Sequence, residues 1–318
     1  MKYHFISNVR VLAMLMVVFY HCLCAYTPLW NMNGIERVDE FYVVAKFLDS
    51  FSMPLFFCIS GFLYMKGLRQ KGIANAKFVI SKTRRLFVPL VVWGLFICAF
   101  LTQDSVFHFF AYGASHLWFC GTLFLMFAIV FVGNHWPNRT KLWLDILLLV
   151  AFFCISCFSL KIPYNPGLIG YKVLVYFYVF WLGIFLAKYE IHSQKIFPWM
   201  AGFCVAVVFL LSAKSGIPFH RYLNKFFVGV FLVAFFPWGL AKWNVRQVFP
   251  KAFDEFSMGV YIIHHIVLAC LLKFDVFVEL FNKCVFLPFL LFPVIFALSL
   301  ALAMFLKKIP AVNRVIGW

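Results

Sequence analysis

The chain is built from largely apolar segments of about 20 residues, separated by short segments that carry most of the charges. The apolar segments cover residues 8–29, 42–65, 86–103, 117–134, 142–160, 172–188, 196–213, 225–241, 256–273 and 284–306. Each is long enough to cross a hydrocarbon layer of roughly 30 Å. Because lipid offers no partners to backbone polar groups, these segments must be helical. We therefore expect an all-α, polytopic membrane helix bundle of about ten transmembrane helices, folded as a single domain over residues 1–318.

Composition excludes a water-soluble fold. Hydrophobic residues make up 65% of the 318 residues and charged residues only 12%, whereas soluble domains carry roughly 25% charged residues. The net charge of +17 would suit nucleic acid, but the basic residues lie mostly between apolar segments, as in cytoplasmic loops. We therefore expect the lipid bilayer as a partner, and no nucleic acid. The ten cysteines lack the spacing of zinc ligands, so no metal is expected.

The distribution of charge predicts the orientation. With the N-terminus inside, the inner segments carry most of the 28 Lys and Arg residues, and the loop acids fall mainly outside. We therefore expect both termini to be cytoplasmic. The longest expected cytoplasmic loop, residues 66–85, is basic and contains no acid. It could attract anionic lipid or dock a polyanionic cytosolic ligand such as a nucleotide-bearing cofactor, and the two roles are compatible.

Two ionisable residues lie in the first apolar segment. An ionisable side chain inside the bilayer costs about 2.5–3.5 kcal/mol, which makes it a candidate for function. Arg10 and His21 are separated by about three helical turns, so they share one face at an axial distance of about 16 Å. Arg10 could instead snorkel to lipid phosphates, and His21 could simply bond a neighbouring helix. Histidine titrates near neutral pH, so His21 is the best-suited general base.

Two later segments also carry polar residues. Ser257, Tyr261 and His264 are spaced i, i+4, i+7, so they form one polar stripe where segment 256–273 begins. His116 and Trp118 lie at the start of segment 117–134. An aromatic belt at the membrane interface would also explain Trp118.

The second segment contains a kink-permitting Pro54 and a Ser60-Gly61 pair. Close helix approach is the commonest role of such a glycine, although Ser60 could also place its hydroxyl beside a ligand. Earlier in the segment, Asp49 follows Lys46 by three residues. We expect those two to form an ion pair at the outer end of the helix.

Basic residues precede the third segment. Lys82, Arg84 and Arg85 lie just before Pro89, which a helix tolerates in its first turn. Arginine binds phosphate bidentately through its forked donors. This group is therefore a candidate site for a phosphorylated ligand.

Taken together, these motifs resemble the bacterial acyltransferase-3 family of integral membrane acyltransferases. The resemblance spans essentially the whole chain, and it is to the stand-alone members, which lack a fused extracytoplasmic hydrolase-like domain. It rests on Arg10 with His21, on Met53–Leu63 with its Ser60-Gly61 pair, on Lys82–Pro89, on His116-Leu-Trp118-Phe, on Ser257–His264 and on the tail 307–317.

The resemblance implies an enzyme of the bacterial cytoplasmic (inner) membrane. It would move an acetyl or other short acyl group from acyl-CoA, with acetyl-CoA as the expected donor, to a hydroxyl of a cell-surface glycan or lipid-linked sugar. His21 would be the catalytic base and Arg10 its partner. Lys82, Arg84 and Arg85 would bind the acyl-CoA. The residues expected to line the site are Ser60, His116, Trp118, Ser257, Tyr261 and His264.

The main alternative is a transporter or flippase for a lipid-linked saccharide, which would also use ionisable residues within the bundle. Secondary transporters often contain inverted repeats and paired broken helices, and the sequence shows no such repeat. A carrier also has little reason for a basic cluster on the donor side. The sequence leaves open the acceptor, the acyl group, the side on which the acceptor binds and the oligomeric state.

Overall fold

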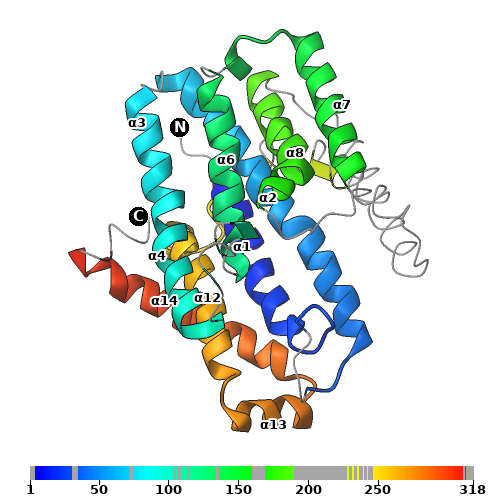
Figure 1. Cartoon of the computed structure of the whole chain (residues 1–318), viewed down its shortest axis with the longest axis vertical. Helices are drawn as coiled ribbons and strands as arrows, with labels where there is room; N and C mark the ends of the chain where they lie inside the picture. Colours follow the sequence, from blue (N-terminus) through cyan, green and yellow to red (C-terminus); the bar gives the residue numbers. More distant parts are fainter. Residues whose placement is uncertain are drawn as a thin grey trace.

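The computed structural model describes residues 4–30, 35–71, 75–102, 115–133, 136–159, 169–189 and 246–310, with isolated positions in 105–112 and 228–242 and residue 312. Within these ranges the regular elements are all helices, and no strand occurs (Figure 1). The all-α prediction is therefore confirmed for the described part of the chain.

The helices follow one another in a simple order. They are α1 (His4–Cys24), α2 (Asp39–Lys71), α3 (Asn75–Lys82), α4 (Val88–Ile97), α6 (Trp118–Val132), α7 (Leu142–Ser159), α8 (Ile169–Tyr189), α11 (Lys251–Glu255), α12 (Ser257–Leu271), α13 (Asp275–Lys283) and α14 (Leu287–Lys307). π-Helical turns cover Thr83–Phe87 and Cys98–Thr102, and 3₁₀ turns cover Ser115–Leu117 and Trp136–Asn138.

Several of these helices can cross a membrane. Five are long and apolar enough by themselves, and α12 with α13 would make a sixth span, bent by 92°. Two shorter apolar helices, α6 and α7, coincide with expected segments. The chain is therefore a multi-pass membrane protein. Expected segment 196–213 lies outside the described residues, as does nearly all of 225–241, so the count of ten and the orientation stay predictions.

Most of the expected cytoplasmic loop 66–85 is helical, and its cytoplasmic location stays a prediction. Helix α2 continues to Lys71 and α3 begins at Asn75. Two apolar residues explain this, since Phe78 is buried and Leu68 packs against the main core. The π-turn at Thr83–Phe87 then leads into α4, and Pro89 lies in the first turn of α4 as predicted.

The long helix α2 forms the centre of the bundle. Its C-terminal half packs against α8, which in turn contacts α6 and α7, and its N-terminal half lies beside α1 (Figure 1). Helices α12 and α14 pack against the other side of α1. Helix α13 lies at one end of the molecule, opposite the junction of α2 with α3 (Figure 1). We call the first the α13 end and the second the α2–α3 end.

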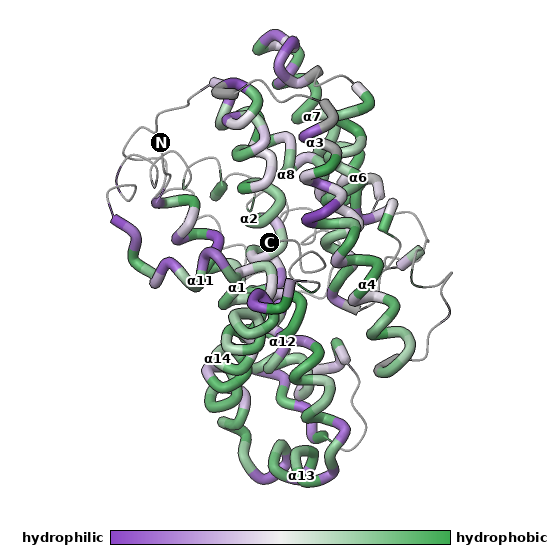
Figure 2. The backbone as a smooth tube through the Cα atoms, turned by 90° about the vertical axis from the view of Figure 1, so that its left-hand side faces the viewer, coloured by the Kyte–Doolittle hydropathy of each residue, from purple (hydrophilic) through white to green (hydrophobic). Residues whose placement is uncertain are grey.

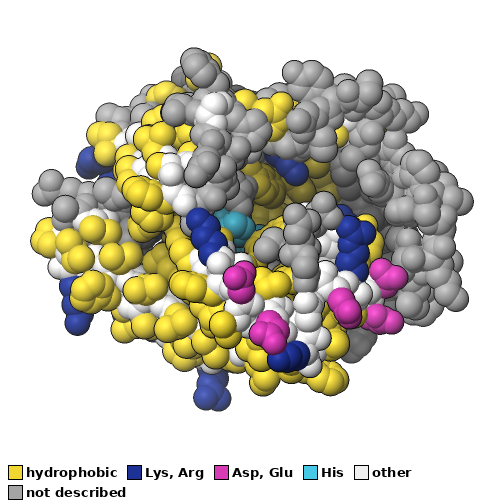
Figure 3. Space-filling model, turned by 60° about the horizontal axis from the view of Figure 1, so that its bottom comes forward, with side chains coloured by type: hydrophobic (Ala, Val, Ile, Leu, Met, Phe, Trp, Pro, Cys, Tyr) yellow, Lys and Arg dark blue, Asp and Glu magenta, His cyan; other side chains and the backbone are white. Residues whose placement is uncertain are grey.

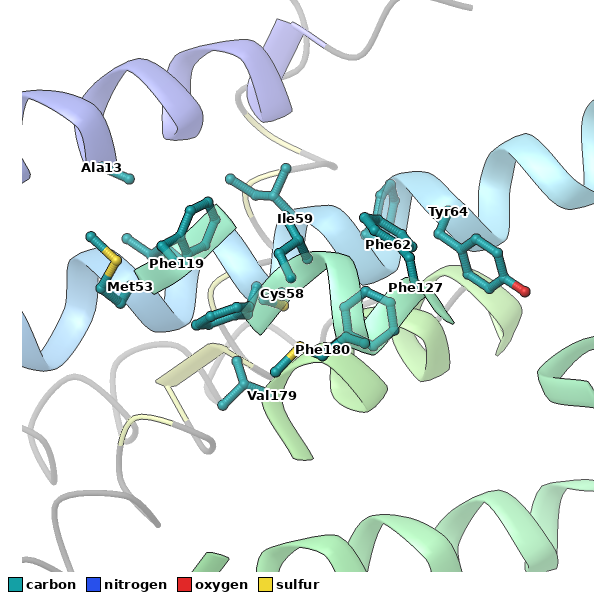
Figure 4. Close-up of a cluster of buried hydrophobic side chains, with 14 of the residues drawn as sticks. Ala13, Met53, Cys58, Ile59, Phe62, Tyr64, Phe119, Phe127, Val179 and Phe180 are labelled. Atoms are coloured by element: carbon teal, nitrogen blue, oxygen red, sulfur yellow. The ribbon is translucent and has the colours of Figure 1, made fainter. Parts of the chain in front are cut away.

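Apolar side chains fill the space between these helices. Figure 2 shows long hydrophobic stretches on α4, α6 and α12, with hydrophilic residues near α11. In the main core, Cys58 and Phe62 of α2 meet Phe119 and Phe127 of α6 and Phe180 of α8 (Figure 4). Four of these five residues are phenylalanines, which fits a chain with 45 Phe residues.

A buried ion pair joins α7 to α8. Lys188 Nζ lies 2.6 Å from Asp145 Oδ2 and also donates to the carbonyl oxygens of Pro137 and Thr140. The Tyr189 hydroxyl donates to the same carboxylate oxygen of Asp145. Lys188, the last residue of the expected segment 172–188, is therefore part of the interior. Its contacts fix α8 against α7.

Glycines allow the backbones of α2 and α8 to approach closely. A Cβ added at Gly61 would lie 2.0 Å from the Phe180 carbonyl oxygen, and one at Gly183 would lie 2.0 Å from the Cys58 carbonyl oxygen. Neither distance is possible for a real side chain, so each glycine fits against the backbone of the other helix. Gly61 therefore serves close helix approach, the commonest of the roles expected for it.

Replacing Gly183 by Ala should destabilise the protein, because the added methyl group must push α2 and α8 apart. Overpacking of this kind costs about 1–3 kcal/mol. Gly170→Ala in the same helix is the matched control, since a Cβ there meets nothing within 4 Å and the gain in helix propensity is common to both changes. Thermal unfolding of the two variants in the same detergent measures the difference. Equal melting temperatures would contradict the close contact.

Candidate active site

Four histidines from three parts of the chain meet inside the bundle. His21 comes from α1, His116 from the 3₁₀ turn before α6, and His264 and His265 from α12. The ring centroids of His21 and His264 are 4.9 Å apart, those of His21 and His116 are 6.2 Å apart, and those of His116 and His265 are 4.6 Å apart. Three of these residues were selected from the sequence, and His265 was not.

Hydrogen bonds define the tautomer of His264. Its Nδ1 lies 2.9 Å from the Val260 carbonyl oxygen. A carbonyl oxygen can only accept, so Nδ1 carries the proton and Nε2 of the neutral ring is an acceptor. That Nε2 lies 3.0 Å from Nδ1 of His21. His264 therefore presents a lone pair to His21.

The same argument defines the tautomer of His21. Its Nδ1 lies 3.0 Å from His264 Nε2 and 3.0 Å from the Val17 carbonyl oxygen. Both neighbours are acceptors, so Nδ1 of His21 must be the donor and Nε2 holds the lone pair. Nε2 receives no hydrogen bond from any residue that the structure describes. His21 is thus held as a base whose free nitrogen is Nε2.

His116 offers a second acceptor. Its Nε2 lies 3.2 Å from the Ile262 carbonyl oxygen and so carries the proton, while its buried Nδ1 has no hydrogen-bond partner within the described ranges. The hydroxyl of Tyr261 donates to the backbone carbonyl oxygen of His116. Tyr261 therefore holds the turn that carries His116, and does not itself line the cavity described next.

A cavity of about 250 Å³ lies against this cluster. It opens toward the α13 end, where Figure 3 shows a histidine in a hollow that is lined by hydrophobic side chains and surrounded by charged ones. Although the histidines lie inside the bundle, a ligand that enters this hollow can reach those that line the cavity. The lining residues are Tyr20, His21, Trp30, Asp49, Ser52, Met53, His116, Trp118 and His265.

Trp118 belongs to the wall of this cavity and to a stack of aromatic rings. Its ring lies 5.9 Å from that of Tyr176 at an interplanar angle of 22°, and Tyr176 stacks on Phe57 at 5.1 Å and 23°. Lys172 Nζ lies 4.7 Å from the centroid of the Trp118 ring. These contacts fix Trp118 as part of the cavity wall. A tryptophan that served only as an interfacial anchor would not need them.

Two serines selected from the sequence do not line the cavity. Ser257 donates through its hydroxyl to the Asp254 carbonyl oxygen, 2.9 Å away, and so stabilises the junction of α11 with α12. Ser60 is half-buried beside Gly61 and is also absent from the lining. Ser52, two turns earlier on α2, lines the cavity instead. Polar residues that belong to the motifs selected from the sequence therefore do not all line the cavity.

Arg10 and His21 contact two consecutive helices, α11 and α12, as expected for residues on one face of α1. Arg10 Nη1 lies 2.9 Å from Asp254 Oδ1 in α11, and His21 contacts His264 in α12. The face of α1 that they share is therefore turned inward to the protein and not to lipid. This ion pair at Arg10 was not expected from the sequence.

The basic residues before α4 lie close to Arg10. Arg85 interacts electrostatically with both Arg10 and Lys82, and Lys82 Nζ lies 3.8 Å from the centroid of the Phe127 ring. Arg84 and Arg85 are exposed. Arg10, Lys82 and Arg85 thus form one basic group, which reaches the surface at Arg85.

The charged residues of α2 depart from expectation. Lys46 and Asp49 interact electrostatically, but within the described part of the chain no ion pair joins them. Asp49 instead lines the cavity. As for metals, no group of three or more His, Cys, Asp or Glu side chains among the described residues is arranged to hold one.

Comparison with known protein families identifies a match over nearly the whole chain. The acyltransferase-3 family, described as an acyltransferase domain, matches the chain over residues 3–308. Neither the curated proteins nor the solved structures contain a match to the chain.

The hydrogen bonds predict that the neutral His21 ring carries its proton on Nδ1, the less common tautomer of free histidine. ¹⁵N NMR of histidine-labelled protein distinguishes the two tautomers, because protonated and unprotonated ring nitrogens differ widely in chemical shift. The signals of His21 are assigned by their loss in the His21→Asn variant. A His21 ring that is protonated on Nε2 would contradict the arrangement.

Proposed function

The chain belongs to the acyltransferase-3 family, and from this premise we propose that it transfers an acetyl or other short acyl group from acyl-CoA to a hydroxyl of a cell-surface glycan or lipid-linked sugar. The proposed location is the bacterial inner membrane. One observation carries the proposal: His21 lines the cavity, and its Nε2 is free while its Nδ1 is bonded to His264. The family match favours an enzyme over the transporter alternative.

The proposed reaction is a direct transfer. Nε2 of His21 takes the proton of the acceptor hydroxyl while the hydroxyl oxygen forms a bond to the thioester carbon. The carbon–sulfur bond then breaks, and the CoA sulfur leaves with the electron pair and receives the proton from Nε2. His21 returns to its starting form, so one base serves both halves of the reaction.

His264 and His116 have supporting roles in this scheme. When His21 takes the proton, both of its ring nitrogens become donors, and the bond to His264 becomes charge-assisted. His264 thereby stabilises the imidazolium and keeps Nε2 directed at the cavity, as the carboxylate does in a serine protease triad. His116 lines the cavity beside His21 and would shape the space that the acceptor enters.

The acyl-CoA donor would approach His21 from the side on which the basic group lies, opposite the α13 end. The phosphates of CoA are polyanionic, and Arg10, Lys82 and Arg85 form the basic group that suits them, with Arg84 at the surface. The axial distance from Arg10 to His21 is about 16 Å, the same order of length as an extended pantetheine arm. The thioester would then reach His21 while the phosphates stay at the basic group. Arg10 would exchange or share its bond to Asp254 when the phosphates bind.

Replacing His21 by Ala should abolish most of the transfer. General base catalysis contributes about 10²–10⁴-fold, so kcat should fall by that factor. The measurement is thiol release from acetyl-CoA by the purified protein in nanodiscs, supplied with an envelope extract as the source of acceptor. His4→Ala in the same helix is the matched control, and it should keep wild-type turnover. Wild-type turnover by the His21→Ala variant would remove the proposal.

Replacing His264 by Ala should lower kcat by about 10–100-fold, because a hydrogen bond to a charged group is worth about 1.5–3 kcal/mol. The KM for acetyl-CoA should not change, since His264 contacts His21 and not the basic group. A rise in that KM with kcat unchanged would show that His264 acts in donor binding instead. The same thiol-release assay provides both constants.

A further inference from the structure

Asp49 is a carboxylate inside the bundle without a described partner. It lies on α2 and lines the same cavity as His21. It accepts no hydrogen bond from any residue that the structure describes, although Lys46 and Lys172 act on it electrostatically. A carboxylate is costly within a membrane. Two cations act on this carboxylate, but no described residue donates a hydrogen bond to its oxygens, so they are available to a ligand.

The chemistry of a carboxylate selects the ligand. Its two oxygens only accept hydrogen bonds, so its partner must supply donors, and two neighbouring hydroxyls match the two oxygens. An ionised carboxylate also disfavours an anionic group in direct contact. The phosphates of the donor are therefore poor ligands for this part of the cavity, and they have a basic group elsewhere.

The size and walls of the cavity define the ligand further. Its volume is about 250 Å³, below the roughly 300–1,000 Å³ of sites for drug-sized ligands, so it accommodates one small ring and not an oligosaccharide. Trp30 and Trp118 provide flat apolar surfaces with polar edges, and the stack with Tyr176 holds Trp118 rigid. A pyranose ring has such a character, with C–H groups on its faces and hydroxyls at its edge.

We propose that Asp49 determines acceptor specificity by binding two neighbouring hydroxyls of a single neutral sugar ring, which enters the cavity from the α13 end. This inference rests on the proposed function, since the bound ring presents its third hydroxyl to His21. Ser52, which lines the cavity one turn further along α2, lies on the same side of the helix as Asp49. The acceptor and the donor thus meet at His21 from opposite sides.

The experiment separates acceptor binding from donor binding. Wild-type, Asp49→Asn and Asp39→Asn proteins are expressed in source cells that lack the chromosomal gene, and the acyl groups on their surface glycans are quantified by mass spectrometry. The affinity of each purified protein for acetyl-CoA is measured by calorimetry. Asp39 is exposed at the start of the same helix, so its replacement controls for the loss of one negative charge.

The expected result is specific to Asp49. Asp49→Asn should lower glycan acylation about tenfold or more while its acetyl-CoA affinity stays within about twofold of wild type, and Asp39→Asn should match wild type in both. Should Asp49→Asn be absent from the membrane, Asp49→Glu replaces it, because it keeps the charge but displaces the two oxygens. Glu should then also lower acylation.

Three results would overturn the inference. Wild-type acylation by the tested Asp49 variant would show that the carboxylate does not hold the acceptor. An equal loss of acetyl-CoA affinity would assign Asp49 a structural role. Wild-type cells whose acyl groups appear on protein or phospholipid, and not on sugar, would exclude the proposed ligand while leaving acyl transfer intact. A wild type that neither binds acetyl-CoA nor acylates any acceptor overturns the proposed function as well.

Discussion

The hydrogen bond between Nδ1 of His21 and Nε2 of His264 connects the architecture of this protein to its chemistry. It joins α1 to α12 within the membrane-spanning part of the bundle, where an unpaired imidazole would be costly. It also decides which nitrogen of His21 is free, since the Val260 carbonyl oxygen fixes the tautomer of His264 first. The proposed roles of the cavity and of the basic group near Arg10 both depend on this free Nε2 of His21.

The helix α1 separates the two ends of the site. Arg10 and His21 lie on the same face, one turned to Asp254 and the other to His264, so the helix axis itself sets the distance between the basic group and the base. The ion pair with Asp254 satisfies Arg10 while no anion is bound. The buried contacts of α2 with α8, made possible by Gly61 and Gly183, hold the opposite wall with Trp118 and its aromatic stack.

The sequence predicts the fold better than it predicts the site. Apolar length locates the spanning helices that the structure describes. It does not reveal that most of residues 66–85 are helical, because a helix anchored by Leu68 and Phe78 also tolerates long basic side chains. Lys188 ends the expected segment 172–188, and the sequence does not show that it is buried against Asp145, 43 residues earlier in the chain. A count of charges records only the residue type, whereas tertiary contacts decide whether a side chain is buried or exposed. His21 and His264 were found from spacing, since helical periodicity specifies a face.

Asp49 shows what spacing leaves undetermined. Three residues after a lysine, it fits an ion pair on one helix face, and nothing in the sequence reveals that a turn from a distant segment brings His116 and Trp118 to it. His21 and Asp49 line one small cavity, each with an acceptor: Nε2 of His21 and the carboxylate of Asp49. Neither receives a hydrogen bond from a residue that the structure describes. Acceptors grouped in this way require a ligand with several donors, and a sugar ring supplies hydroxyls at adjacent carbons of one rigid frame. One of these acceptors, Nε2 of His21, is also the proposed base that removes a hydroxyl proton from the ring. Recognition and catalysis would therefore share atoms.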